Sequence, residues 1–461
     1  MNISIILAAG EGTRMKSNIP KVLHNVCGKP ILSYIIDASK KANIDKNYVI
    51  VGHGGDKVKE KLGEDNIIFK NQPVGKDHPY GTGYAVMQAI DHIEDNSNVI
   101  ILCGDTPLIT DRTVKKLITY HKENQCDGTV LTAILDNPSG YGRIVRDKNN
   151  NLLKIVEDKD ATDEEKAIRE INSGIYCING KLLKYALGKI DNKNAQGEYY
   201  ITDVITILKE EGRKIGAYII DDSKEIHGVN SRVQLAFCEK IMRSRINQRH
   251  MLEGVTIIDP ENTYIEDGVS IGKDSIIYPG AIITGDTVIG ENCVIGQNSR
   301  IENCKIENKV EIYSSTIEES IIGDGCIIGP YAHMRPNSIL GKNIRLGNFV
   351  EVKNSSLGDG TKAAHLAYIG DADIGKNVNI GCGVIFVNYD GNSKSRTLVE
   401  DDSFIGSNSN LIAPVAVRQR GYIAAGSTIT DEVGEGCLSI ARARQVNKDG
   451  WVDKKHHKNG K

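Results

Sequence analysis

The second half of the chain carries an aliphatic residue at every sixth position, and this period constrains its fold more than any other feature. A hexapeptide repeat is typical of a parallel β-helix, in which each hexapeptide forms one flat face and three form a coil of about 18 residues. The period begins at Ile265 and continues in three series, Ile271, Ile277, Ile283, Ile289, Ile295 and Ile301, then Ile322, Ile328, Met334, Leu340 and Leu346, then Val399, Ile405, Leu411, Val417, Ile423 and Ile429. Roughly ten coils are therefore expected between residues 255 and 435.

The composition agrees with a narrow core of this kind. The 461 residues include 47 Gly but only 5 Phe and 1 Trp. Inside a β-helix each face contributes one inward side chain of medium size, and these stack at the strand spacing of about 4.8 Å. Aromatic side chains therefore have little use there. The six-residue count breaks near residues 352–369, where polar residues gather, and a loop interrupts it at residues 387–392.

The first half of the chain has a different pattern, in which apolar strand-like runs alternate with helix-like stretches. This alternation predicts an α/β fold. The runs are Ile3–Leu7, Tyr48–Val51, Val99–Leu102, Thr129–Leu135 and Ile215–Ile220, and the helix-like stretches are Ile31–Lys41 and Gly83–His92.

A helix with apolar spacing over Val233–Met251 is predicted to connect the halves. We therefore expect an α/β domain over residues 1–232, a helical linker over 233–253 and a repeat domain over 254–461. The last domain ends in a basic tail that we expect to be solvated and partly disordered, with Lys454, Lys455, Lys458 and Lys461.

Charge and hydropathy exclude several classes of function. The 57 Lys and Arg residues balance 60 Asp and Glu residues, a net charge of −3, so no electrostatic footprint for nucleic acid or for a membrane surface is expected. There is no run of about 18 apolar residues that could span a membrane, and no secretory signal is expected. None of the ten cysteines forms a C-x-x-C pair. Reduced thiols in a cytoplasmic protein are the simplest interpretation.

A glycine-rich turn after the first strand is suited to binding phosphates. The strand runs into Leu7-Ala8-Ala9-Gly10-Glu11-Gly12-Thr13-Arg14-Met15, with Pro20-Lys21 following. Backbone N–H groups in such a turn approach phosphate oxygens closely. Met15 replaces the third Gly of the dinucleotide fingerprint, and no Walker Lys-Ser/Thr is present. Arg14 and Lys21 would instead offset the charge of a triphosphate, although a G-x-G turn can also be only a tight turn.

Asp105 follows the strand Val99–Leu102, and ligands of open α/β sheets bind beyond the carboxyl ends of strands. A carboxylate there suits Mg²⁺, which bridges phosphates. The alternative is that Asp105 caps the helix after Pro107.

A second group of polar residues lies within the repeats. Imidazole is the usual general base near neutral pH, so His365 is a candidate for removing a proton from an attacking amine. Arg335 and Lys353, on neighbouring coils, would bind the phosphate of a sugar phosphate. Each has a simpler reading, His365 as a structural histidine and the two cations as surface residues.

With these sites in view, the chain closely resembles the bacterial GlmU family. In that family an N-acetylglucosamine-1-phosphate uridylyltransferase is joined to a glucosamine-1-phosphate N-acetyltransferase. The resemblance covers nearly the whole chain, and its motifs occur in the same order. They are Leu7–Arg14, Pro20-Lys21, Gly81-Thr82-Gly83, Gly104-Asp105, Gly140-Tyr141-Gly142-Arg143, Val156-Glu157, Ile171–Gly174, Ala195–Asp203, Lys362–Ala372 and Val387–Asn392.

The resemblance implies a nucleotidyltransferase domain with a Rossmann-like mixed sheet, followed by a left-handed parallel β-helix. It implies that Leu7, Ala8, Ala9, Gly10 and Lys21 line the nucleotide phosphates and that Arg14 activates the triphosphate. It places Gln72, Gly81 and Thr82 at the uracil, Gly142, Glu157 and Asn172 at the sugar, and Asp105 and Asn230 at Mg²⁺. The chain departs from the family at Pro73–Tyr80, an insertion of about four residues that replaces a second Gln, and at Tyr84, where the family usually has His.

For the repeat domain the resemblance implies an acetyltransferase site between the subunits of a homotrimer. His365 matches the catalytic base. The sugar-phosphate residues would be Arg335, Lys353, Tyr368 and Asn379, and the acetyl-CoA residues Cys382, Asn388, Tyr389, Ser407, Ala425 and Arg442. Position 382 is usually Ala in this family, and position 367, here Ala, is usually Thr.

The expected activity is acetylation of glucosamine-1-phosphate by acetyl-CoA, followed by Mg²⁺-dependent uridylyl transfer from UTP that releases pyrophosphate. The product, UDP-N-acetylglucosamine, feeds peptidoglycan and other cell-wall precursors. One alternative is a nucleotidyltransferase for another sugar-1-phosphate or for dTTP. Another is a regulatory subunit of similar architecture without working chemistry, against which intact Arg14, Lys21, Asp105 and His365 argue.

Overall fold

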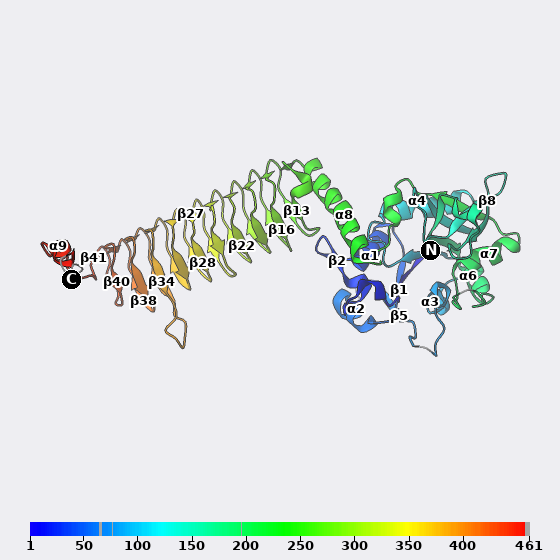
Figure 1. The fold of residues 1–461 in the computed structure, drawn as a ribbon, viewed down its shortest axis with the longest axis horizontal. Coiled ribbons are helices and arrows are strands. Elements are labelled where there is room, and N and C mark those ends of the chain that lie inside the picture. Colours follow the sequence, from blue (N-terminus) through cyan, green and yellow to red (C-terminus); the bar gives the residue numbers. More distant parts are fainter. Residues whose placement is uncertain (64–66, 76, 195, 457–461) are drawn as a thin grey trace. The chain divides into compact units, whose positions relative to one another are not determined.

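The computed structural model describes residues 1–63, 67–75, 77–194 and 196–456. The chain divides into two compact units, Met1–Arg243 and Ser244–Lys461. The first is an α/β unit and the second contains the repeats (Figure 1). Among the described residues no helix is both long and apolar enough to cross a membrane.

The α/β unit is built on one mixed sheet in the order β11-β7-β10-β6-β1-β4-β5, and β8 and β9 form a hairpin at β10. Strand β1 is parallel to β4 and β6, whereas β10 runs antiparallel to β6 and β7. The strands are β1 (Asn2–Ala8), β4 (Lys46–Val51), β5 (Ile68–Asn71), β6 (Asn98–Cys103), β7 (Gly128–Ile134), β8 (Arg143–Arg146), β9 (Leu152–Val156), β10 (Glu170–Asn179) and β11 (Ile215–Ile219), with a separate hairpin of β2 (Asn25–Val26) and β3 (Lys29–Pro30).

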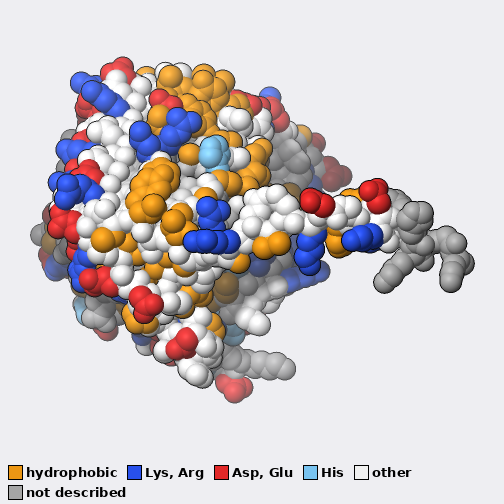
Figure 2. Space-filling model, turned by 90° about the vertical axis from the view of Figure 1, so that its left-hand side faces the viewer, with side chains coloured by type: hydrophobic (Ala, Val, Ile, Leu, Met, Phe, Trp, Pro, Cys, Tyr) orange, Lys and Arg blue, Asp and Glu red, His pale blue; other side chains and the backbone are white. Residues whose placement is uncertain are grey.

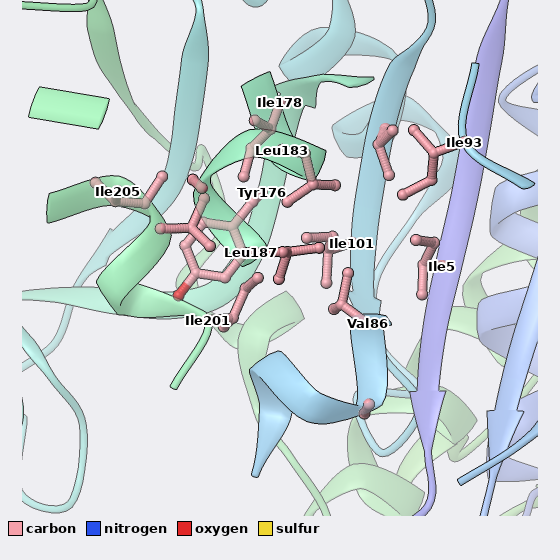
Figure 3. Packing of buried hydrophobic residues seen from close by; sticks show 14 of the residues in the cluster. Ile5, Val86, Ile93, Ile101, Tyr176, Ile178, Leu183, Leu187, Ile201 and Ile205 are labelled. Carbon is pink, nitrogen blue, oxygen red and sulfur yellow. The ribbon is translucent and has the colours of Figure 1, made fainter. Parts of the chain in front are cut away.

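Several helices of this unit pack apolar side chains against the sheet. Side chains of α3, α6 and α7 meet those of β1, β6 and β10 in one buried cluster that includes Ile5, Val86, Ile101, Tyr176 and Leu187 (Figure 3). The helices within the unit are α1 (Ile31–Lys41), α2 (Gly55–Leu62), α3 (Thr82–Met87), α4 (Asp111–Glu123), α5 (Asp163–Lys166), α6 (Gly180–Leu187) and α7 (Thr202–Glu210), with 3-10 turns at Thr13–Met15, Lys21–Leu23, Ile90–His92 and Ser223–Ile226. Helix α8 (Arg232–Leu252) belongs to both units, since the boundary between them falls after Arg243.

The strands predicted from the sequence all form, with ends shifted by a residue or two, and α1 has its predicted bounds. The helix predicted over Gly83–His92 is wrong in its second half. The Gln88 side chain donates to the Tyr84 carbonyl oxygen at 2.9 Å, and the Gln88 N–H bonds to Ala85 instead. A side chain that competes for a helical carbonyl in this way favours an end to the helix.

The repeat unit is a left-handed parallel β-helix whose three faces are three parallel sheets. The first sheet, β12 to β41, consists of β12 (Thr256–Ile257), β15 (Ile276–Ile277), β18 (Val294–Ile295), β21 (Glu311–Ile312), β24 (Ile327–Ile328), β27 (Arg345–Asn348), β30 (Lys362–His365), β33 (Asn379–Ile380), β36 (Phe404–Ile405), β39 (Tyr422–Ile423) and β41 (Leu438–Ser439).

The second sheet consists of β13 (Tyr264–Ile265), β16 (Ile282–Thr284), β19 (Arg300–Glu302), β22 (Thr316–Glu318), β25 (His333–Met334), β28 (Glu351–Lys353), β31 (Tyr368–Gly370), β34 (Ile385–Val387), β37 (Asn410–Ile412) and β40 (Thr428–Ile429). The third consists of β14 (Ser270–Ile271), β17 (Val288–Ile289), β20 (Lys305–Ile306), β23 (Ile321–Ile322), β26 (Ile339–Leu340), β29 (Ser356–Leu357), β32 (Ala372–Ile374), β35 (Thr397–Val399) and β38 (Val415–Val417), and a 3-10 turn at Pro260–Asn262 lies before β13.

The six-residue count does break near residue 352, but the β-helix continues through that region. Val352, Leu357, Ala363 and Ile369 are all buried, although Leu357 follows Val352 after only five residues. The corner between them is one residue shorter than a regular corner. Its left-handed residue, Asn354, has a φ of 47° and comes only two positions after Val352. A shortened corner therefore keeps the next aliphatic side chain in the core.

Two further features of the repeats follow the sequence prediction in part. The chain leaves the β-helix between β34 and β35 as a loop, which projects from the ribbon in Figure 1. The tail forms a short helix, α9 (Trp451–His456), which includes Lys454 and Lys455, whereas Lys458 and Lys461 lie outside the described residues.

Figure 2 looks onto the end of the β-helix, where apolar side chains lie at the surface among charged ones; Leu438 and Ile440 are each 60% exposed. The last strand, β41, is therefore not covered by the part of the chain that the structure describes.

A buried histidine in α4 makes the stability of the α/β unit dependent on pH. His121 is 4% exposed, its Nδ1 atom lies 2.9 Å from the Thr129 hydroxyl, and burial lowers its pKa from 6.5 to about 4. Between these values the unfolded chain binds a proton that the folded chain does not, so stability falls as pH decreases from about 6.5 to about 4. The loss reaches about 3 kcal/mol.

We expect His121→Gln to reduce this pH dependence, measured as the midpoint of denaturant unfolding of the α/β unit across that range. The exposed His53 provides the matched control, because His53→Gln should leave the dependence unchanged. Equal slopes for wild type and His121→Gln would contradict the assignment.

Candidate active sites

A cavity of about 240 Å³ lies beyond the carboxyl ends of β1 and β6. It brings together residues from the glycine-rich turn, from the segment before α3 and from the end of β6. Its lining is Leu7, Ala8, Ala9, Gly10, Lys21, Val22, Gln72, Tyr80, Gly81, Thr82, Ala85, Cys103, Asp105 and Glu198. The sequence-predicted residues of the nucleotide site thus meet in one place, except Arg14, which is exposed on the Thr13–Met15 turn and does not line the cavity.

Glycines allow the chain to come close together at this edge of the sheet. Gly12 has a φ of 65°, and a Cβ atom there would lie 2.7 Å from the Cβ of Lys21. A Cβ atom on Gly104 would lie 2.6 Å from the Leu7 carbonyl oxygen. Side chains at either position would push apart the turn and the strand end that form the cavity. The two glycines therefore place Lys21 and Asp105 at the same opening.

Lys21, Asp105 and Asn230 form one polar cluster. The Lys21 ammonium lies 2.5 Å from Asp105 Oδ2 and donates to Asn230 Oδ1 at 3.0 Å. The side chains of Lys21 and Asp105 are 13% and 20% exposed. One cation thus contacts both predicted metal ligands at once. A carboxylate and an amide oxygen are donors that Mg²⁺ accepts, with phosphates and water as its remaining ligands. The donor set therefore fits a divalent cation.

The residues predicted to hold the sugar form a second cluster. The Asn172 N–H donates to the Gly142 carbonyl oxygen at 2.8 Å, and a Cβ on Gly142 would lie 3.5 Å from Glu157 Oε2. The Thr202 hydroxyl donates to Glu157 at 3.3 Å, and burial raises the pKa of Glu157. Since the next residue back, Ile201, donates to the Thr82 hydroxyl at 3.1 Å, this cluster adjoins the cavity.

Several lining residues were not predicted from the sequence. Tyr80 lies at the end of the insertion, and its carbonyl oxygen accepts from Tyr199 at 2.8 Å, which brings Glu198 to the same wall. Glu198 lies within the Ala195–Asp203 motif of the family resemblance, but no role was predicted for this residue. Cys103 ends β6, where its thiol donates to the Gly174 carbonyl oxygen at 3.4 Å. Burial raises its pKa to about 12, so this thiol is a poor nucleophile.

In the β-helix, four predicted residues lie at one corner, between the first and second sheets. We call this the His365 corner; it contains His365, Cys382, Ser407 and Ala425. Backbone hydrogen bonds stack its levels, from Gly383 to Leu366 at 2.8 Å, from Asn408 to Cys382 at 2.7 Å and from Gly426 to Ser407 at 2.8 Å. Arg442 reaches the same corner, since its Cδ atom is 3.8 Å from a Cβ built on Gly426.

His365 is exposed, and its Nδ1 atom lies 3.1 Å from Asn348 Oδ1 on the preceding coil. With that oxygen as the acceptor, Nδ1 carries the ring proton and Nε2 is left as the basic nitrogen. Asn348 lies opposite His365 in the register of β27 and β30. No sequence motif points to Asn348, because its place beside His365 follows only from the length of the coil.

Other predicted residues meet at the corner between the second and third sheets, which we call the Lys353 corner. Here Lys353 pairs with Asp371 at 3.2 Å, and Asn388 also donates to Asp371. Burial alone would raise the pKa of Asp371, but these donors and Asn354 hold it below its usual value. The Tyr368 hydroxyl lies 3.5 Å from the Asn388 amide nitrogen.

Two more cations lie near the Lys353 corner. Arg335 pairs with Glu351 at 3.1 Å. The Lys353 ammonium lowers the pKa of Lys394, with a smaller contribution from Arg335, so three positive groups converge there. Lys394 was not predicted; it lies in the loop, where its position could not be read from the repeat.

The remaining predicted residues do not join these groups within one chain. Asn379 begins β33 in the first sheet, where it pairs with Lys362 and Phe404, on a different face from Lys353. Tyr389 is 55% exposed in the loop, and its hydroxyl donates to Gly391 at 2.6 Å. A single chain therefore presents the predicted acyl-transfer residues as separate groups on different parts of the β-helix.

Both halves match known families. The nucleotidyl transferase model matches residues 3–226, the model of the eIF2B subunit epsilon β-helix domain matches residues 248–352, and the model of the hexapeptide repeat of succinyl-transferase matches residues 396–431. "Bifunctional protein GlmU" of Clostridioides difficile is 56% identical over 455 residues, covering 99% of this chain and 98% of that protein. The protein of the same name from Alkaliphilus oremlandii is also 56% identical, over 98% of both chains, and that of a Geobacillus strain is 53% identical over 98% of this chain and 97% of its own.

This similarity extends over essentially the whole length of both chains, and the phosphate turn, the Lys21 cluster and the repeats all lie within it. The chain therefore belongs to the GlmU family, as a bifunctional N-acetylglucosamine-1-phosphate uridylyltransferase and glucosamine-1-phosphate N-acetyltransferase of UDP-N-acetylglucosamine synthesis.

Proposed function

We propose that uridylyl transfer takes place in the 240 Å³ cavity, with roles divided along its wall. The backbone of Leu7–Gly10 and the Lys21 ammonium bind the UTP phosphates, and Arg14 offsets the charge that develops on the leaving pyrophosphate. Gln72, Gly81 and Thr82 bind the uracil, while Gly142, Glu157 and Asn172 bind the sugar. The observation that carries this proposal is the convergence of Lys21, Asp105 and Asn230 at the mouth of the phosphate turn.

We further propose that Asp105 and Asn230 hold Mg²⁺. The contact of both oxygens with one ammonium supports it, since a cation there is already within reach of the pair. When bound, the ion supplies charge neutralisation for the transferring phosphoryl group. Lys21 then orients the triphosphate, and the sugar-1-phosphate oxygen attacks the α-phosphorus as the bond to pyrophosphate breaks.

For acetyl transfer we propose that the site is closed between the copies of a homotrimer. The partition of the predicted residues over separate parts of the β-helix supports this, because Asn379 and Lys353 of one chain lie on different faces. Arg335, Lys353, Tyr368 and Asn379 bind glucosamine-1-phosphate, and Cys382, Asn388, Tyr389, Ser407, Ala425 and Arg442 bind acetyl-CoA. His365 Nε2 takes a proton from the sugar amine, whose nitrogen attacks the acetyl carbonyl carbon as the CoA thiolate leaves.

The division of labour that we propose is a uridylyltransferase domain over residues 1–232, a helical linker over 233–253 and an acetyltransferase domain over 254–461. Acetylation comes first and its product is the substrate of the α/β unit. The product serves cell-wall precursors such as peptidoglycan. Six of the ten cysteines are buried, and none is predicted to form a disulfide, which suits the reducing cytoplasm, where we place the enzyme.

The decisive experiment measures pyrophosphate release and thiol release by the same preparation. With N-acetylglucosamine-1-phosphate we expect pyrophosphate from UTP in preference to dTTP, CTP or ATP, and we expect EDTA to abolish it until Mg²⁺ is restored. Thiol release from acetyl-CoA should be insensitive to EDTA. Equal turnover of dTTP, or pyrophosphate release that survives EDTA, would contradict the nucleotide or the metal assignment.

A further inference from the structure

An ion pair beside the sugar cluster joins a buried arginine to a half-buried aspartate, and it has no role in the sites described so far. The Arg143 side chain is 2% exposed, and its guanidinium donates to Asp158 Oδ1 at 2.9 Å and to the Tyr141 carbonyl oxygen. Its Nε atom is buried without a hydrogen-bond partner among the described residues. Burying a guanidinium with one N–H unpaired costs free energy, so a fold that keeps it there calls for an explanation.

Arg143 connects the two segments that carry the sugar residues. It lies opposite Val156 in the antiparallel pair of β8 and β9, which places Gly142 beside Glu157. The guanidinium binds the chain on both sides of this contact. It donates to the Tyr141 carbonyl oxygen, just before Gly142, and to the Asp158 carboxylate, just after Glu157. Its position therefore fixes the spacing between Gly142 and Glu157.

The same ion pair also governs the charge around Glu157. Burial is the main cause that raises the pKa of this carboxyl, and the negative charges of Asp160, Asp203 and Asp158 raise it further. The Thr202 hydroxyl, which donates to it, acts in the opposite direction, and the phenols of Tyr176 and Tyr200 face it as well. Of the three like charges, Asp158 is the one that Arg143 neutralises.

We propose that Arg143 is a positioning residue of uridylyl transfer, which holds Gly142 and Glu157 in register for the sugar hydroxyls of N-acetylglucosamine-1-phosphate and screens Glu157 from Asp158. The proposal rests on the assignment of Gly142 and Glu157 to the sugar. An ionised carboxylate accepts hydrogen bonds from two hydroxyls, whereas a protonated one loses part of that capacity. Arg143 therefore acts on sugar affinity and not on UTP.

The test compares three variants of the full chain, Arg143→Met, Asp158→Asn and the double variant, over a pH range that starts near the ordinary pKa of a glutamate, about 4.3, and extends to about pH 8.5. For Arg143→Met we expect the KM for N-acetylglucosamine-1-phosphate to rise about tenfold or more, with the KM for UTP within about twofold. The pH at which sugar affinity is half lost should move up, by about half a unit or more, because Asp158 is left unscreened.

Asp158→Asn tests the opposite change, since it removes the negative charge near Glu157 and leaves the guanidinium of Arg143 in place. The pH at which sugar affinity is half lost should then move down, and in the double variant it should return toward the wild-type value. A purely structural role for Arg143 would raise both KM values together and leave the pH unchanged, which would overturn the proposal. If Arg143→Met does not fold, Asp158→Asn alone tests the proposal. In that case, the proposal is overturned if the pH at which sugar affinity is half lost rises or stays the same.

A fourth variant separates this proposal from the one on which it rests. Glu157→Gln should raise the KM for the sugar phosphate and abolish the pH dependence. If it leaves that KM unchanged, the sugar-site assignment has failed. If it raises the KM while Arg143→Met does not, the assignment stands and the role of Arg143 is wrong.

Discussion

The variant Asp105→Asn is expected to lose uridylyl transfer by about 100-fold or more and to keep acetyl transfer. Asn has the same shape as Asp and can still accept a hydrogen bond from Lys21, which lies 2.5 Å from the carboxylate. The fold of the strand end is therefore retained. What is lost is the negative charge that attracts the metal ion to the phosphates. Pyrophosphate release and thiol release measured on one preparation report the two activities separately.

The control for this variant is Asp111→Asn, since Asp111 also pairs with a lysine, Lys115 at 2.7 Å, but on the exposed face of α4. Both activities should be unchanged there. Raising the Mg²⁺ concentration should recover part of the rate of Asp105→Asn, because the remaining oxygen ligands still bind the ion weakly. Normal turnover of UTP by Asp105→Asn would show that the metal is held elsewhere.

The parts of the fold that could be predicted from the sequence are those in which a local rule repeats. Ile289 and Ile295 are inward residues of successive faces, and the six-residue period states this directly. Leu357 is an exception to this rule, as are Ile306 and Ile374, because a corner can omit one residue when its left-handed residue, here Asn354, comes one position earlier. Such an omission depends on backbone geometry at one position and has no period.

In the sites, residues near the end of a strand were predictable and those brought in by tertiary contacts were not. Lys21 and Asp105 flank a glycine-rich turn and a strand end, which carry recognisable signals. Tyr80 and Glu198 reach the cavity because the backbone of Tyr199 bonds to that of Tyr80. Asn348 reaches His365 because one coil is 17 residues long at that point. Neither relation can be seen in a linear motif.

The variant His365→Ala is expected to lose acetyl transfer by about 10²–10⁴-fold, the usual effect of removing a general base. His365 is exposed, and its ring contacts the amide oxygen of Asn348, so its removal leaves no cavity in the core. The β-helix should therefore keep its stability. Uridylyl transfer to preformed N-acetylglucosamine-1-phosphate should be unchanged, because its cavity lies in the other compact unit.

Asn348→Ala refines this prediction, since it removes the acceptor that fixes the ring proton on Nδ1. Its rate should fall by less than that of His365→Ala, by about tenfold, because the base remains but is poorly oriented. His333 offers a control on the same β-helix: it is half-buried in β25, its Nε2 atom lies 3.6 Å from Glu318, and it is not among the residues predicted to bind either substrate. His333→Ala should leave thiol release unchanged.

Mixing two inactive variants then tests whether the site is closed between copies. His365→Ala and Asn379→Ala change residues at different places on the β-helix, so if one site draws them from different chains, a mixed trimer contains some sites with both groups intact. Such sites should restore part of the thiol release that either variant lacks alone. Undiminished thiol release by His365→Ala would return that residue to a structural role, and loss of both activities in it would mean that the two units are coupled.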